Sequence, residues 1–170
     1  MSKQKKIETA GGERVTHPIP PVFDEHSKIL ILGSFPSVKS RESGFFYGHP
    51  QNRFWRVLSS LFHEDLPVTI DEKRAFLLRN GVALFDVLAA CRIVGSSDSS
   101  IRDMRPNDLT PILSRAKIER IYTNGAQASA LYRRYLQRET GIECIALPST
   151  SPANAAFSLE KLIAEWHLIL

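Results

Sequence analysis

The chain has 170 residues, of which 43% are hydrophobic, and this is enough for one domain with a proper core. It carries 22 Lys and Arg against 18 Asp and Glu, a modest positive excess that permits a polyanionic partner without requiring one. The two cysteines, Cys91 and Cys144, form no paired motif and the five histidines are scattered. The sequence therefore offers no ligand set for a thiolate zinc site or an iron–sulfur cluster.

Residues 1–14 lack an apolar pattern, and we expect a disordered basic tail there, followed by a single domain at 15–170. The tail contains no secretory signal, and no apolar run in the chain approaches membrane-spanning length. We therefore expect a cytoplasmic protein with no membrane partner. Residues 17–23 are rich in proline and are predicted to lie extended along the domain surface.

Four continuous apolar segments predict strands, at 28–35, 82–88, 118–123 and 143–147. Continuous runs are typical of parallel strands that are covered on both faces. Apolar residues at helical spacing predict helices at 52–62, 71–79, 107–116, 126–139 and from 158 to the end. This alternation predicts an α/β sandwich with right-handed crossovers. The loops that follow the strands, at 33–51, 89–106, 124–125 and 148–156, should then line one rim of the sheet, where open α/β sheets bind ligands.

The loop after the first predicted strand offers groups that suit a flat, uncharged ring. Gly33 and Ser34 allow a ligand to approach the backbone closely. Phe45, Phe46 and Tyr47 are adjacent in sequence, so they cannot all face the core, and at least one should meet solvent or a ligand. Stacking of a nucleobase on such a ring is worth about 1–3 kcal/mol.

The polar residues near this loop leave their roles open. Asn52 is explained equally well as a helix cap or as a catalytic amide. Arg53 and Arg56 are either phosphate contacts or ordinary surface charges. Asp86, at the end of the second predicted strand, is either a buried polar anchor or part of the site.

A second polar motif follows the last predicted strand. Ser149, Thr150 and Ser151 stand between two prolines and form a stiff loop dense in hydrogen-bond donors, which could grip a phosphate or enter a minor groove. An ordinary polar turn, with Asn154 or Ser158 capping the final helix, explains the same residues. The loop at 92–106 is either a flexible lid or a plain surface loop.

Taken together, four segments resemble the uracil-DNA glycosylase superfamily, and most of all its hypoxanthine-DNA (deoxyinosine) glycosylase family. They are 33–37 (GSFPS), 47–55 (YGHPQNRFW), 81–88 (GVALFDVL) and 147–154 (LPSTSPAN). The resemblance implies a three-layer αβα sandwich around a four-stranded, mainly parallel sheet. It also implies a monofunctional glycosylase that hydrolyses the bond between a deaminated base and its deoxyribose after flipping the nucleotide out of DNA, with no cofactor.

Two departures favour the hypoxanthine type over a pure uracil type. Mismatch-specific uracil glycosylases carry an asparagine where this chain has Phe35, so the water-positioning amide must lie elsewhere, and the resemblance assigns it to Asn52. The major uracil glycosylases carry a histidine where this chain has Leu147, so that imidazole is missing from the second motif.

The resemblance and the residues together give a hypothesis for the site. Asn52 is the catalytic residue, and the flipped base is bound by Gly33, Ser34, Phe35, Phe46, Tyr47 and Asp86. DNA is contacted by Arg53, Arg56, Ser149, Thr150, Ser151 and Asn154. The expected partner is DNA with a deaminated base, bound by a monomer. Two other classes stay open at this point, a non-catalytic nucleic-acid-binding module and a hydrolase of small nucleosides.

Overall fold

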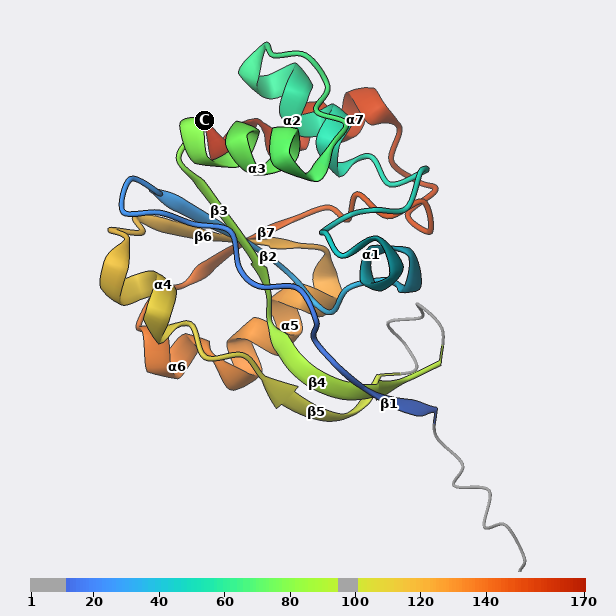
Figure 1. Ribbon diagram of the computed structural model, residues 1–170, viewed down its shortest axis with the longest axis vertical. Helices are drawn as coiled ribbons and strands as arrows, with labels where there is room; N and C mark the ends of the chain where they lie inside the picture. Colours follow the sequence, from blue (N-terminus) through green and yellow to red (C-terminus); the bar gives the residue numbers. More distant parts are fainter. Residues whose placement is uncertain (1–11, 95–100) are drawn as a thin grey trace, which may run out of the picture.

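A computed structural model describes residues 12–94 and 101–170, and its centre is a four-stranded sheet (Figure 1). The strands are β2 (Ile29–Gly33), β3 (Val82–Asp86), β6 (Arg120–Asn124) and β7 (Cys144–Leu147). They pair in the order β3-β2-β6-β7, and every pairing is parallel. The two strands β2 and β3 are buried throughout, which explains their continuous apolar sequence.

Helices cover both faces of this sheet, so the predicted αβα sandwich is confirmed (Figure 1). One face carries α2 (Phe54–Phe62), α3 (Ile70–Arg79) and α7 (Leu159–Trp166), which is followed by the 3-10 turn η2 (His167–Ile169). The other face carries α4 (Thr110–Arg115), α5 (Ala126–Tyr135) and α6 (Gln137–Thr140). A short helix, α1 (Val38–Ser43), stands at the carboxyl end of β2, within the segment predicted to be loop.

Local sequence explains how these helices begin and what they bury. In α3, Thr69 and Glu72 form a capping box in which each side chain accepts the other residue's backbone N–H. In α2, Phe54, Trp55 and Leu58 belong to the buried face, where the Phe54 ring contacts Trp166 of α7 and the Trp55 ring contacts Phe76 of α3. None of the helices among the described residues is long and apolar enough to cross a membrane.

A second, antiparallel sheet was not predicted. It consists of β1 (Glu13–Thr16), β4 (Leu88–Ile93) and β5 (Arg102–Pro106), in the order β1-β4-β5. The segment 89–106, expected to be loop, therefore contributes two strands, although 95–100 lies outside the described residues. The predicted tail at 1–14 also reaches too far, because Glu13 and Arg14 already pair with β4, while 1–11 lies outside the described residues.

The proline-rich segment 17–23 connects the two sheets. Its Val22 exchanges two backbone hydrogen bonds with Leu84 of β3, at 3.0 and 2.9 Å. Ile19 and Val22 are buried, so the segment covers the edge of the parallel sheet and does not simply rest on the surface. It also brings His17 to the carboxyl end of β3, next to Asp86.

Candidate active site

A pocket of about 360 Å³ opens at the carboxyl rim of the parallel sheet. The last residues of three strands lie in its wall: Gly33 of β2, Asp86 of β3 and Asn124 of β6. Such a rim is where open α/β sheets bind ligands, and the volume lies within the range of about 300–1,000 Å³ that is usual for ligand pockets. The remaining wall comes from the loops after β2 and β7, namely Ser34, Phe35, Pro36, Ser37, Ser40, Phe46, Tyr47, His49, Asn52, Ser149, Thr150, Ser151, Pro152 and Ala153.

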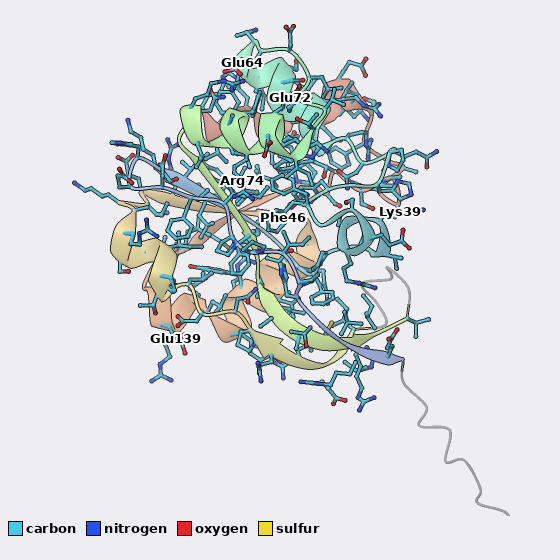
Figure 2. All side chains as sticks on the ribbon, in the orientation of Figure 1. Lys39, Phe46, Glu64, Glu72, Arg74 and Glu139 are labelled. Carbon is cyan, nitrogen blue, oxygen red and sulfur yellow. The ribbon has the colours of Figure 1, made fainter. Side chains whose placement is uncertain are left out.

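Aromatic rings form one side of the pocket. Phe35 and Phe46 are almost fully buried, and Phe46 lies inside the molecule, whereas charged residues such as Glu139 lie at its periphery (Figure 2). The Tyr47 ring stacks on Phe54, with centroids 4.1 Å apart and planes at 22°. Tyr47 also has φ +53°, a left-handed backbone conformation that costs about 1–3 kcal/mol for such a residue and that clusters at functional sites.

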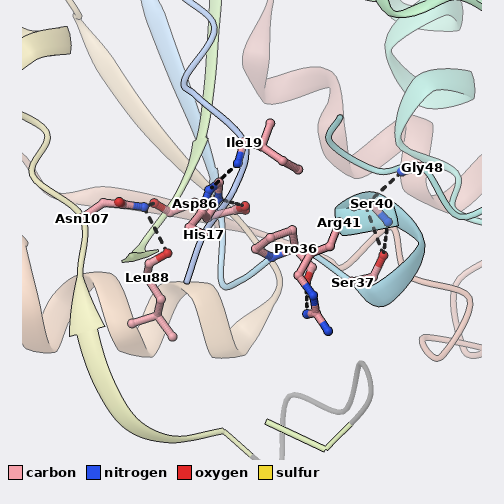
Figure 3. Close-up of polar contacts among 10 residues, drawn as sticks. All are labelled: His17, Ile19, Pro36, Ser37, Ser40, Arg41, Gly48, Asp86, Leu88 and Asn107. Atoms are coloured by element: carbon pink, nitrogen blue, oxygen red, sulfur yellow. Dashed lines mark hydrogen bonds and ion pairs between the residues drawn. The ribbon is translucent and has the colours of Figure 1, made fainter. Parts of the chain in front are cut away.

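The helix α1 fixes the path of the aromatic loop. Ser37 caps it by accepting the Ser40 backbone N–H at 3.2 Å, and the Ser40 hydroxyl in turn accepts the N–H of Gly48 at 3.0 Å (Figure 3). Arg41 donates to the carbonyl of Pro36 at 2.8 Å. These bonds tie the two ends of the segment 36–48 together and so set the position of Tyr47.

The Asn52 carboxamide is oriented by a chain of hydrogen bonds. At one end the Phe54 backbone N–H donates to Oδ1 of Asn52 at 2.9 Å. At the other, the Thr150 N–H donates to Oδ1 of Asn124, whose Nδ2 donates to the Thr150 hydroxyl, both at 3.0 Å. That hydroxyl then donates to Oδ1 of Asn52 at 2.9 Å. Because backbone N–H groups fix both ends, Oδ1 of Asn52 is the acceptor, and its Nδ2 is the donor that remains for a ligand.

Among the described residues that line the pocket, Asp86 is the one acid. Its side chain is 4% exposed, and Oδ2 lies 2.7 Å from Nε2 of His17. A Cβ on Gly33 would lie 2.4 Å from Oδ1 of Asp86 and 3.0 Å from Oη of Tyr47. Only glycine at this position therefore lets the carboxylate and the tyrosine approach the end of β2 together.

Three comparisons with known proteins identify the family to which this fold belongs. A sequence model described as the uracil DNA glycosylase superfamily matches residues 20–168.

The chain belongs to the uracil DNA glycosylase superfamily.

Two relatives are named hypoxanthine DNA glycosylase. The protein of Methanosarcina acetivorans is 38% identical over 152 residues, which cover 88% of this chain and 94% of the relative. The protein of Methanosarcina barkeri is 37% identical over 148 residues, which cover 86% and 92%. The solution NMR structure of a candidate uracil DNA glycosylase from M. acetivorans superposes with a TM-score of 0.75 at 34% identity, covering 91% of this chain and 98% of that one. The resemblance found in the sequence is thereby confirmed.

Within this superfamily fold, the residues predicted to bind the base come together. Asn52 and all six predicted base-binding residues, Gly33, Ser34, Phe35, Phe46, Tyr47 and Asp86, line the same pocket. Of the residues predicted to contact DNA, Ser149, Thr150 and Ser151 also line it, whereas Arg53, Arg56 and Asn154 do not. Their contacts with base or DNA remain predictions.

Two of the residues predicted to contact DNA are already bonded within the protein. The Arg53 guanidinium donates to four backbone carbonyls of the loop after β7, at Ser151 (2.8 Å), Asn154 (3.1 Å), Thr150 (3.4 Å) and Phe157. Thr150 is fully buried, and its hydroxyl is used between Asn52 and Asn124. Both side chains therefore hold the protein together, because an irregular loop needs donors for its half-buried carbonyls.

The other polar residues of this loop have mixed positions. Asn154 donates to the carbonyl of Ser149 at 3.0 Å, which matches the alternative of a structural turn. The hydroxyls of Ser149 and Ser151 each accept a backbone N–H at 3.2 Å and can still donate their own hydrogen. Arg56 is exposed and touches the carbonyl of Pro50 at 3.2 Å.

Sequence reasoning missed His17 and Asn124 as parts of the site. Asn124 ends a predicted strand, and that position was the signal that could have identified it. His17 lies 69 residues from its partner Asp86, in a segment with no motif.

Among the residues that the structure describes, no three His, Cys, Asp or Glu side chains gather in a way that could hold a metal ion.

Proposed function

We propose that this protein is a DNA glycosylase that hydrolyses the N-glycosidic bond of a deaminated base, with hypoxanthine preferred and uracil second, after the nucleotide has flipped out of the duplex. The observation that carries this proposal is that a carboxamide donor, Asn52, and a carboxylate acceptor, Asp86, line one pocket beside aromatic rings. The names of the two relatives support the choice of hypoxanthine.

The donor and the acceptor complement the chemical change that deamination makes. Deamination converts an amino group beside a bare ring nitrogen into a carbonyl beside a ring N–H. In this proposal Asp86 accepts the new N–H and Nδ2 of Asn52 donates to a carbonyl of the base or to the attacking water. Adenine and cytosine present the opposite pattern, and a bare ring nitrogen facing a carboxylate is repelled.

The cleavage step needs charge stabilisation on both sides of the broken bond. Water adds to C1′ of the deoxyribose and the C1′–N electron pair leaves with the base. The one proton that the water loses ends on the base nitrogen, directly or through solvent. Positive charge develops on the sugar, where the flanking phosphates stabilise it, and negative charge on the departing base. A donor from Asn52 acts on that base or on the water, in a site where fixed dipoles are worth more than in bulk solvent. Tyr47 holds the ring by stacking.

A panel of DNA duplexes tests the proposal. Each carries one hypoxanthine, uracil, xanthine or mispaired thymine, and strand cleavage after alkali reports base release under single-turnover conditions. We expect the fastest release for hypoxanthine. Tight binding with no cleaved strand for any base would support a non-catalytic binding module. Rapid hydrolysis of free deoxyinosine with inert duplexes would support a nucleoside hydrolase. Either result would overturn the proposal.

Two further expectations belong to this proposal. The first is the cytoplasmic location that the sequence leads us to expect. The pocket is built from one chain and must admit a duplex, so we also propose a monomer, which sedimentation equilibrium can test.

A further inference from the structure

A buried hydrogen bond between His17 and Asp86 links the pocket to the N-terminal segment. His17 and Asp86 have side chains only 3% and 4% exposed, and Nε2 of His17 lies 2.7 Å from Oδ2 of Asp86 (Figure 3). A carboxylate removed from water in this way is costly unless a donor satisfies it. His17 precedes residue 20, where the match to the superfamily begins, so this donor comes from outside the matched region.

The tautomer of His17 follows from its second hydrogen bond. The backbone N–H of Ile19 donates to Nδ1 of His17 at 3.2 Å, so Nδ1 is the bare acceptor nitrogen and the ring hydrogen is on Nε2 (Figure 3). The imidazole therefore donates an N–H to Oδ2 of Asp86. A proton on Oδ2 would point at that N–H, so this arrangement is compatible only with a carboxylate oxygen that accepts.

The orientation of the imidazole is also fixed. Its ring meets Phe35, Phe46 and Phe85, with centroids 5.9, 6.0 and 5.1 Å away, and its backbone N–H donates to the carbonyl of Ala89 at 2.7 Å. Two of these rings, Phe35 and Phe46, line the pocket as well. The imidazole thus stands directly behind the pocket wall and cannot turn away from Asp86 without disturbing that wall.

The two oxygens of Asp86 consequently face different surroundings. Oδ2 is bound to His17, while Oδ1 lies next to Gly33, which lines the pocket. We propose that His17 is a positioning residue that keeps Asp86 an acceptor-only carboxylate at the pocket, and that it thereby sets the selectivity for bases whose ring nitrogen carries a hydrogen. This inference rests on the proposed glycosylase function, and it adds a residue that determines the selectivity for the base.

The chemistry predicts what happens without the imidazole donor. A carboxyl group with no donor on Oδ2 can accept a proton on that oxygen, and only in this protonated form can it donate a hydrogen. A group that both donates and accepts can bind a bare ring nitrogen as well as a ring N–H. Loss of His17 should therefore relax discrimination, and it should do so more than it slows release of the correct base.

The test compares two purines that differ at N1. Hypoxanthine carries N1–H, whereas 2′-deoxynebularine, a purine without the 6-oxo group, has a bare N1. For each duplex we would measure single-turnover base release and take the ratio of the two rates. We expect His17→Phe, which keeps an aromatic ring but no donor, to reduce this ratio at least tenfold. His17→Gln, whose amide can donate near the place of Nε2, should restore most of it.

Two controls separate positioning from a purely structural effect. In an Asp86→Ala background, His17→Phe should leave the ratio unchanged, because its effect passes through the carboxylate. Should His17→Phe fail to fold, His17→Leu serves as the donor-free variant, with thermal unfolding recorded for each protein. Equal slowing of both substrates with an unchanged ratio would overturn the inference while leaving the glycosylase function intact. Absence of base release by the wild-type protein would instead overturn the proposed function.

Discussion

The two loops that enclose the pocket use their side chains in opposite ways. The loop after β2, residues 34–53, places aromatic rings and the Asn52 amide at the cavity. The loop after β7, residues 148–158, has the more polar sequence, yet Thr150 is fully buried, and four of the loop's carbonyls accept from Arg53. Both loops line the pocket, but the second also uses the Thr150 hydroxyl and its own carbonyls to hold the first loop in place. A motif dense in hydrogen-bonding groups is therefore not by itself a binding motif, since an irregular backbone needs such groups for its own satisfaction.

The largest effect is expected at Asn52, where the two loops meet. Asn52→Ala should lower single-turnover release of hypoxanthine by about 10²–10³-fold, the loss typical for one preorganised donor, with DNA binding mostly kept. Asn52→Asp is the matched variant, because it keeps an acceptor for Phe54 and Thr150 but has no N–H donor. It should be as slow as Asn52→Ala while unfolding at a temperature closer to that of the wild type. Normal base release by Asn52→Asp would show that the donor is not required.

A smaller loss is expected when the second loop stops orienting that amide. Thr150→Val removes the hydroxyl that donates to Asn52 and accepts from Asn124, at nearly constant volume. It leaves Asn124 with an unsatisfied amide, which should cost about 1–3 kcal/mol of stability. Because the Asn52 amide would be less well oriented, we expect base release to fall by about tenfold, with affinity for the duplex little changed. A tenfold loss corresponds to a rise of about 1.4 kcal/mol in the activation free energy. Thr150→Ser keeps the hydroxyl and should retain most activity. Equal activity of the Thr150→Val and Thr150→Ser variants would show that the Thr150 hydroxyl does not orient Asn52.

The same contrast explains how much could be predicted from the sequence. The four parallel strands and the ligand-binding rim of their sheet could be predicted because continuous apolar runs are local signals in the sequence. Gly33 and Asp86 stand at the ends of two such strands, where a site is expected. The antiparallel sheet was not, because β1 pairs with β4 across more than seventy residues and neither strand has a strong pattern of its own. Whether Arg53 contacts DNA or the neighbouring loop depends on which carbonyls lie within reach, and that is decided only by the tertiary structure.

A third prediction tests the contrast between the two loops through the thermal stability of an Arg53 variant. Arg53→Gln removes a donor fork from four carbonyls of the second loop. If about 2 kcal/mol is lost, the midpoint of thermal unfolding should fall by about 4–8 °C, as expected for a chain of this length. Amide exchange should speed up in residues 149–157 before it does elsewhere. An unchanged midpoint together with weaker DNA binding would restore the phosphate role that the sequence suggested.

Arg56 lies in the first turn of α2, three residues after Arg53, and the smallest effect is expected there. Its side chain is exposed, and the contact that it makes is to the carbonyl of Pro50 at 3.2 Å. If the guanidinium neutralises one DNA phosphate, Arg56→Gln should reduce the slope of log affinity against log salt by about 0.9, with little change in thermal unfolding or in the single-turnover rate. Arg53→Gln should leave that slope unchanged, because its charge is already directed into the protein. Equal slopes for wild type and Arg56→Gln would mean that the phosphate contacts lie elsewhere on the rim, and the basic side chain of Arg41 beside Phe35 would be the next to test.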